Sequence, residues 1–248
     1  MKAWFKLFVV LCLLLISHVA EATLTLDGNN SASFSTVTIT TVDNNDLIIV
    51  FLASTNATGC TGIGDQAGLT WINRVAAQNN SVNGNVVSEW YAISSGTLSA
   101  DVITPTGCPV TPRIVALGVN GANLTCPYDT NASLPGLAAN SGTLNPITTT
   151  ISTTNPNTFV VQFVRVPGSG TPIFTTPTGY TAMVSAGGAA ASYYKILSSP
   201  ETSVTEGVNW GGSGQGSNPA LIVDAINDVT AGCGVTSPYN PPMLFRPF

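Results

Sequence analysis

Residues 36–52 read TVTITTVDNNDLIIVFL, and residues 148–164 read TTTISTTNPNTFVVQFV, which is the same layout displaced by 112 positions. Each stretch runs from an alternating, threonine-rich segment through an Asn-rich turn into an apolar, β-branched segment. Further blocks repeat in the same order along the chain, namely 68–70 with 179–181, 89–93 with 192–196, and 114–120 with 221–227. We interpret the sequence as an internal duplication.

The repeated segments have the pattern of strands rather than of helices. Thr36, Thr38 and Thr40 alternate with apolar residues, as in a strand with one face in water. Residues 47–52 and 159–164 are nearly continuous apolar runs, so we expect central strands that are covered on both faces. Strands are expected near 34–41, 47–54, 69–77, 86–94, 101–104 and 113–119 in the first half, and near 147–153, 159–166, 180–185, 192–197, 202–210 and 220–226 in the second.

These strands predict an all-β fold, an antiparallel β-sandwich of jelly-roll or Greek-key type built from two internally duplicated halves. The halves span about residues 32–133 and 145–233, and the connector between them is short. We therefore expect one sandwich domain over residues 23–233. The tail, residues 234–248, is rich in proline and aromatic residues and has no counterpart in the first half. It is either a strap over the sandwich or an arm for a neighbour.

Residues 1–22 have the layout of a secretory signal peptide. Lys2 and Lys6 precede an apolar run, and Ala20-Glu21-Ala22 forms a small-x-small cleavage site. The run is shorter than the roughly 20 residues that a spanning helix needs, so a retained anchor is the weaker alternative. No other segment is apolar enough to span a membrane. We expect a secreted chain, extracellular or on the cell surface, that begins at Thr23.

Composition excludes several classes of function. Charged residues make up only 8% of the sequence, against about 25% in ordinary soluble domains. Cleavage after residue 22 leaves five basic and eleven acidic residues, and it removes His18, the one histidine. So few cations argue against nucleic-acid binding. Without histidine, neither a Ser-His-Asp site nor a histidine-ligated zinc site can form.

Cysteine spacing predicts how the two halves are joined. An even number of cysteines in an exported chain suggests two disulfides, with three possible connectivities. Cys126 and Cys233 are 107 residues apart, which is also the shift between the repeated blocks 114–120 and 221–227. The two cysteines therefore occupy equivalent positions in the two halves. Residues related by a pseudo-twofold axis touch only near that axis, so a bond between these two would staple the halves together. The four disulfide residues are Cys60, Cys108, Cys126 and Cys233.

Residues 71–77 and 86–92 are interpreted as a hairpin around a turn at 81–84, in a register that places Arg74 opposite Glu89. A carboxylate pair for glycoside hydrolysis would have to come from Glu89, Asp65 and Asp101. A cross-strand ion pair with Arg74 is the simpler role for Glu89. We therefore predict Arg74 and Glu89 as a structural pair, no catalytic residue, and a protein that is not an enzyme.

Two other groups of residues also have simple explanations. The turn Asp43-Asn44-Asn45-Asp46 offers oxygens for calcium, but its repeat at residues 155–158 keeps the turn without a carboxylate. An Asx turn explains both, and no metal or cofactor site is predicted. The aromatic residues that could stack on sugars come in adjacent pairs, so alternation places one of each pair in the core. They are Trp90, Tyr91, Tyr193 and Tyr194.

Several short motifs occur in a fixed order. They are Gly68-Leu69-Thr70-Trp71 with Arg74, Glu89-Trp90-Tyr91-Ala92, Leu98-Ser99-Ala100-Asp101, and the segment 121–135. Together they resemble a recurrent group of uncharacterised secreted or phage-associated microbial β-sandwich proteins with GLTWxxR…EWYA motifs. The resemblance covers most of the chain after residue 22 and implies a surface or extracellular setting, with no catalytic residues. The cysteines and the tail depart from that pattern.

The leading hypothesis is a secreted, non-enzymatic structural protein, a surface or extracellular filament subunit that assembles through β-strand pairing. Sandwich proteins usually guard exposed edge strands with lysine, and this chain keeps only Lys195 after residue 22. Residues 23–35 or the tail could add a strand to a neighbour, so self-association is expected. The alternative is a glycan- or receptor-binding β-sandwich module.

Overall fold

The computed structural model contains sixteen β-strands and no helix within the residues that it describes. These are residues 23–33, 35–55, 59–80, 85–140, 144–167, 172–186, 188–212 and 218–233. The predicted signal peptide, the predicted hairpin turn at 81–84 and the tail 234–248 lie outside the described residues. Within the described residues, no helix is long and apolar enough to cross a membrane.

Each half of the chain contributes eight strands. The first eight are β1 (Thr25–Ala32), β2 (Val37–Ile39), β3 (Asp46–Ser54), β4 (Gly62–Gly64), β5 (Ile72–Asn80), β6 (Asn85–Ser94), β7 (Asp101–Thr106) and β8 (Arg113–Asn120). The others are β9 (Gly136–Ala139), β10 (Ile147–Ile151), β11 (Thr158–Arg165), β12 (Ile173–Thr175), β13 (Thr181–Ala186), β14 (Ala190–Ile196), β15 (Val204–Gly211) and β16 (Ala220–Asn227).

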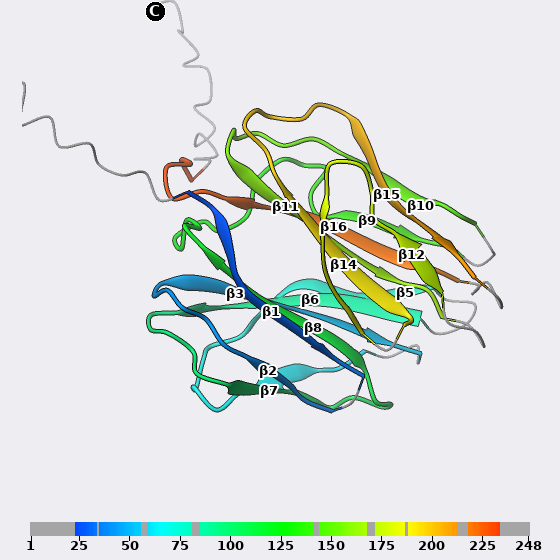
Figure 1. Cartoon of the computed structure of the whole chain (residues 1–248), viewed down its shortest axis with the longest axis horizontal. Helices are drawn as coiled ribbons and strands as arrows, with labels where there is room; N and C mark the ends of the chain where they lie inside the picture. The colour runs from blue at the N-terminus through cyan, green and yellow to red at the C-terminus, as the bar shows by residue number, and fades with distance from the viewer. Residues whose placement is uncertain are drawn as a thin grey trace, which may run out of the picture.

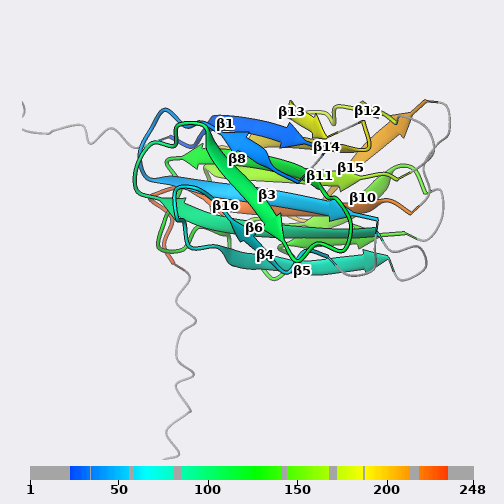
Figure 2. The same ribbon diagram turned by 90° about the horizontal axis from the view of Figure 1, so that it is seen from below.

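The strands form four sheets stacked as successive layers (Figure 1), which overlap one another when the molecule is seen from below (Figure 2). The two inner sheets have five strands each, in the orders β1-β8-β3-β6-β5 and β13-β14-β11-β16-β9. The outer face of each is covered by a three-stranded sheet, β2-β7-β4 in the first half and β10-β15-β12 in the second. Because one apolar cluster contains residues of both inner sheets, the two halves form a single packed body.

The central strands of the inner sheets explain this layering. Every residue of β3 and β11 is buried. Successive side chains of a strand point to opposite faces. Thus Phe51 of β3 packs in the central cluster between the inner sheets, while Val50 packs under the outer sheet. Phe51 and Phe163 stack across the interface between the halves, with ring centres 5.0 Å apart. The prediction of central strands covered on both faces is confirmed.

The two halves share one strand order. Read from its first strand, the inner sheet of the first half has the order β1-β8-β3-β6-β5, and that of the second half has the order β9-β16-β11-β14-β13. If the strands of the second half are counted from β9, the two orders are the same. The outer sheets, β2-β7-β4 and β10-β15-β12, correspond in the same way. All these pairs are antiparallel. The all-β, antiparallel fold is therefore as predicted. The jelly-roll type and the superposition of the halves stay predictions.

The expectation that residues 23–35 are spare for a neighbour is wrong. Residues 25–32 form β1, which pairs with β8 from Thr25 opposite Asn120 to Ala32 opposite Ile114. β9 pairs with β16 in the same way, so β1 has a counterpart in the second half. The sequence TLDGNNSA has the composition of a turn, and it adopts an extended conformation because β8 offers a free edge for backbone hydrogen bonds.

Both disulfides close within the described residues. Cys60 bonds to Cys108, which ties the loop before β4 to the loop after β7. Cys126 bonds to Cys233, so the segment after β8 is linked to the segment after β16. The predicted staple between the halves is confirmed. Two disulfides are compatible with an oxidising compartment.

Candidate functional site

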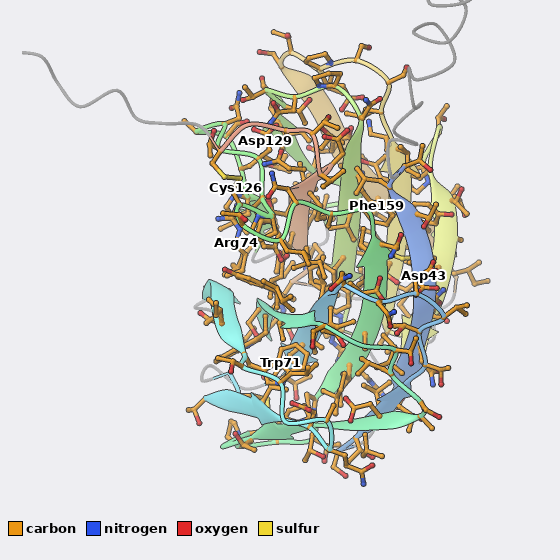
Figure 3. The ribbon with its side chains drawn as sticks, turned by 90° about the vertical axis from the view of Figure 1, so that its left-hand side faces the viewer. Asp43, Trp71, Arg74, Cys126, Asp129 and Phe159 are labelled. Atoms are coloured by element: carbon orange, nitrogen blue, oxygen red, sulfur yellow. A yellow bond between two sulfur atoms is a disulfide. The ribbon has the colours of Figure 1, made fainter. Side chains whose placement is uncertain are left out.

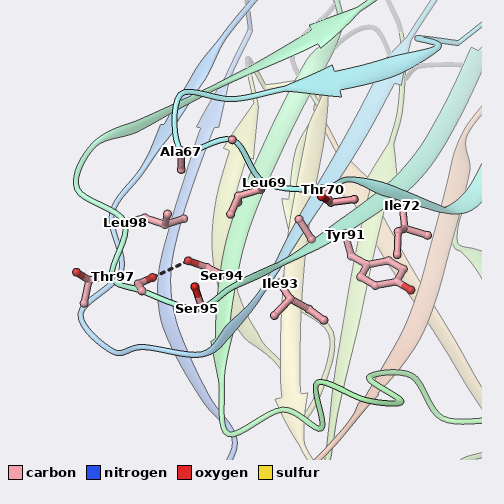
Figure 4. Close-up of a pocket in the computed structure, with 13 residues that line it drawn as sticks. Ala67, Leu69, Thr70, Ile72, Tyr91, Ile93, Ser94, Ser95, Thr97 and Leu98 are labelled. Atoms are coloured by element: carbon pink, nitrogen blue, oxygen red, sulfur yellow. Dashed lines mark hydrogen bonds between the residues drawn. The ribbon is translucent and has the colours of Figure 1, made fainter.

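A surface groove of about 520 Å³ opens where the loop 67–70 meets the end of β6 (Figure 4). This size falls in the range of roughly 300–1,000 Å³ typical of ligand pockets. Its larger side chains are Leu69, Ile72, Tyr91, Ile93 and Leu98, and the rest of the lining is Ala67, Gly68, Thr70, Ala92, Ser94, Ser95, Gly96 and Thr97. Since the lining holds no Asp, Glu, Lys, Arg or Cys, the groove suits an uncharged ligand and offers no pair for acid–base catalysis.

Two carboxylates hold the loop that forms one wall of the groove. Asp65 accepts hydrogen bonds from the Leu69 N–H at 3.0 Å and from the Trp71 indole N–H at 2.7 Å. Asp101 accepts hydrogen bonds from the backbone N–H groups of residues 66 and 67, at 3.0 and 2.9 Å. Burial raises the pKa of Asp101. Two of the three candidates for the carboxylate pair, Asp65 and Asp101, therefore have a structural role.

The same loop contains a glycine that needs its conformational freedom. Gly68 has a φ of 75°, and Gly179, its counterpart in the second half, has a φ of 81°. L-residues with side chains rarely adopt this left-handed conformation. The repeated blocks at 68–70 and 179–181 thus preserve a turn.

Glu89 lies apart from these carboxylates, in the interior between the two inner sheets. It is fully buried, and neither carboxyl oxygen has a hydrogen-bond partner among the described residues. Burial, reinforced by the charge of Asp224, raises the pKa of Glu89 well above its usual range. Glu89 is sealed from the groove, so the structure does not bring it together with Asp65 and Asp101 as a catalytic pair.

The ion-pair partner of Arg74 is Asp224 on β16 (Arg74 is labelled in Figure 3). Arg74 Nε donates to Asp224 Oδ2 at 2.8 Å, and Nη2 donates to Oδ1 at 3.2 Å. A β-bulge at Arg74 places Val75, and not Arg74, opposite Glu89, so the predicted register is wrong by one residue. The guanidinium also lies 4.4 Å from the ring centre of Tyr128. Arg74 thus forms its ion pair across the two halves, and its charge also acts on the nearby Glu89.

One sequence signal points to this ion pair. Asp224 is the only charged residue in the largely apolar strand β16, ALIVDAIN. A carboxylate that is fully buried needs a cation or several donors. The partner, 150 positions away in sequence, cannot be found without the topology of the two halves.

A second polar network lies inside the second half. The Lys195 ammonium contacts Glu201 Oε1 at 2.5 Å and Glu206 Oε1 at 2.6 Å. Gln162 Nε2 donates to Glu206 Oε2 at 2.8 Å, and Lys195 also lies 5.0 Å from the ring centre of Tyr180. In the first half, the repeat shift of 112 places Val50 at the position of Gln162. The network is therefore specific to the second half, and it connects an inner sheet to its outer sheet.

The Asp43–Asp46 turn has the geometry of an Asx-rich turn in both halves. Asn45 has a φ of 63°, and Asn157 at the repeat-equivalent position has a φ of 52°. Asp27 accepts two backbone N–H bonds from residues 42 and 43, and Asp129 accepts two from residues 154 and 155. Within the described part of the chain, no three His, Cys, Asp or Glu side chains are arranged to hold a metal ion.

The aromatic candidates for sugar stacking separate clearly. Trp90 and Tyr193 pack against the outer-layer clusters. Tyr194 stacks on Phe159 with ring centres 4.9 Å apart. Of the four, Tyr91 lines the groove described above, and its ring meets Tyr128 edge-on in the interior.

Comparisons with known proteins give no identification: no family model, no curated protein and no solved structure matches the chain. Function must therefore be argued from the geometry.

Proposed function

We propose that the protein is a secreted, non-enzymatic structural protein, a surface or extracellular filament subunit that assembles through β-strand pairing. The observation that carries the proposal is the composition of the sheet edges. Of the eight strands at the edges of the four sheets, six contain no Asp, Glu, Lys or Arg, namely β2, β4, β9, β10, β12 and β13. Charged side chains, lysine above all, are the usual means of preventing edge-to-edge pairing.

Among these six, β10 is best suited to pairing. It has five residues, ITTTI, and pairs with β15 without a bulge, whereas the longer β13 is bulged. Bulges and short length make an edge a poor template for a further strand. Thr148 and Thr150 of β10 point to solvent. A regular, uncharged edge of this kind can accept a strand from a second copy.

The location of the basic residues supports a structural role. Arg74 and Lys195 are held in ion pairs in the interior, and Arg165 is buried. Arg113 is half-buried. The described cations thus connect layers or fill the interior, and the exposed side chains among the described residues are mostly uncharged, polar and apolar alike. Such a body presents little chemistry to a substrate.

Electron microscopy of the purified protein tests the proposal. We expect filaments or ordered arrays, and we expect the variant Thr148→Lys/Thr150→Lys to remain folded but to lose them. A matched control, Ser198→Lys/Ser199→Lys, adds the same charge on an exposed loop and should keep assembly. Monodisperse particles under all conditions, or assembly that survives the edge variant, contradicts strand pairing at β10.

The groove favours a second candidate, a glycan-binding module. Its lining combines one aromatic ring, Tyr91, with the hydroxyl side chains of residues 70, 94, 95 and 97 and contains no charged group, as recognition of a neutral sugar requires. Binding on an array of neutral glycans, lost in Tyr91→Ala and kept in Tyr194→Phe, would favour this function. The absence of any array signal would remove it.

A further inference from the structure

A second, smaller cavity lies at the end of the interface between the halves. Its volume is about 330 Å³, and its lining is Ser33, Ala53, Ser54, Thr55, Thr111, Arg113 and Arg165. Arg113 begins β8 of the first half, and Arg165 ends β11 of the second. The cavity thus contains two guanidinium groups, several hydroxyl groups and no carboxylate.

The two arginines occupy related positions in the duplicated fold. Arg113 lies opposite Ala53 in the register of β3 and β8, and Arg165 lies opposite Ala220 in the register of β11 and β16. By the repeat shifts, Ala53 is the counterpart of Arg165, and Arg113 is the counterpart of Ala220. Each half therefore supplies one arginine to the same cavity. The first half supplies it from β8 of the pair β3–β8, and the second half from β11 of the equivalent pair β11–β16.

Two of the three guanidinium nitrogens of Arg165 lack, among the described residues, the partners that buried donors normally have. Only 5% of its surface is exposed, and its Nε and Nη1 atoms are buried without a hydrogen-bond partner among the described residues. Buried polar groups are nearly always hydrogen-bonded, because leaving a charged donor unpaired is costly. Burial, and then the like charge of Arg113, lowers the pKa of Arg165 to about 10. The group stays positively charged at neutral pH.

We propose that this cavity binds an oxyanion, a sulfate or phosphate group, between Arg113 and Arg165. Guanidinium groups are preferred partners of sulfate and phosphate, and Nε and Nη1 of Arg165 are donors without a partner among the described residues. The hydroxyl groups of Thr55 and Thr111 line the same cavity and can donate further bonds. The bound charge would also relieve the repulsion between the two arginines. The volume admits the ion, or the terminal group of a sulfate or phosphate ester.

Isothermal titration of the purified protein with sodium sulfate and sodium phosphate tests the proposal, with sodium chloride at matched ionic strength as the control for screening. We expect saturable binding of one anion per chain and a melting temperature that rises with the anion concentration. Arg113→Gln should weaken binding at least about tenfold, since it removes a charged donor, and Arg113→Lys should have an intermediate effect. Ser99→Asp, which changes the net charge equally on an exposed loop, should bind as the unmodified protein does.

Arg165→Met provides a second, independent readout. It should abolish binding and raise the melting temperature of the anion-free protein, because it replaces an uncompensated buried charge by an apolar chain of similar length. Tighter binding of glucose 6-sulfate or glucose 6-phosphate than of the inorganic ions would assign the cavity to esters, and the reverse order to free anions. Absence of saturable binding, or equal affinity in Arg113→Gln, overturns the proposal.

Discussion

Replacing Arg74 by methionine removes the cation that connects the two halves across the central interface. Asp224 is fully buried, and its carboxylate accepts both the Nε and Nη2 bonds of Arg74. Glu89, also fully buried, would lose the same neighbouring cation. Removing one member of a buried ion pair costs about 3–5 kcal/mol, because the remaining charge is left without compensation. We expect Arg74→Met to lie in this range.

Guanidinium chloride unfolding at pH 7, followed by tryptophan fluorescence with the disulfides intact, measures the effect. For an m value of roughly 4 kcal/mol/M, the loss corresponds to a midpoint shift of about 1 M. The double variant Arg74→Met/Asp224→Leu should recover most of the loss, since it leaves neither an unpaired Asp224 nor an unpaired Arg74. Its matched single variant, Asp224→Leu, should be destabilised because Arg74 then lacks its partner.

The pH dependence of Arg74→Met gives a second check. The pKa values of both Glu89 and Asp224 are raised by burial, so their folded-state pKa lies above the unfolded value. A carboxyl of this kind destabilises the folded state as pH rises, since the unfolded chain ionises first. Without Arg74, stability should therefore fall more steeply between pH 4 and pH 8 than in the unmodified protein. A loss below about 1 kcal/mol at pH 7, with no change in this slope, would refute the role given to the ion pair.

Three further predictions concern other contacts of the same body. Phe51→Leu and Phe163→Leu should each destabilise the protein, and a double-mutant cycle by chemical unfolding should give a coupling of about 0.5–1.5 kcal/mol, the value for an aromatic pair; additivity would argue against the stack. Burial raises the pKa of Asp46 to about 6, so stability should fall as pH rises from 4 to 6, and Asp46→Asn should flatten that dependence; equal slopes would contradict it. Cys126→Ser/Cys233→Ser should lower the free energy of unfolding by about 4–5 kcal/mol in the chain-entropy model; an unchanged unfolding midpoint would show that this disulfide does not constrain the chain.

The strands that form the centre of each inner sheet could be predicted from the sequence, but the contacts between the sheets could not. Every residue of 47–52 and 159–164 is apolar except Gln162, so both faces of each strand are apolar. This pattern is why central strands could be predicted. β1 could not, because a polar edge strand is stabilised by the backbone of β8 and not by its own side chains.

The polar sites depended on long-range topology. Nothing near Arg74 distinguishes Glu89, the carboxyl on its own hairpin, from Asp224 on the other half. Likewise, Arg113 and Arg165 become neighbours only when the inner sheets are stacked. Asp224 in β16 and Gln162 in β11 do give a sequence signal, since each is a lone charged or amide residue inside a largely apolar strand. Such a residue indicates a buried partner but not its position in the sequence.

We conclude that the two halves form one body connected through the central interface. Differential scanning calorimetry of the oxidised, purified protein tests this conclusion most directly. The shared apolar cluster, the Phe51–Phe163 stack and the Arg74–Asp224 ion pair all join the halves. We therefore predict a single transition whose calorimetric enthalpy equals the van't Hoff enthalpy. Two resolved transitions, each with half of the enthalpy, would show that the halves unfold independently and would contradict the account.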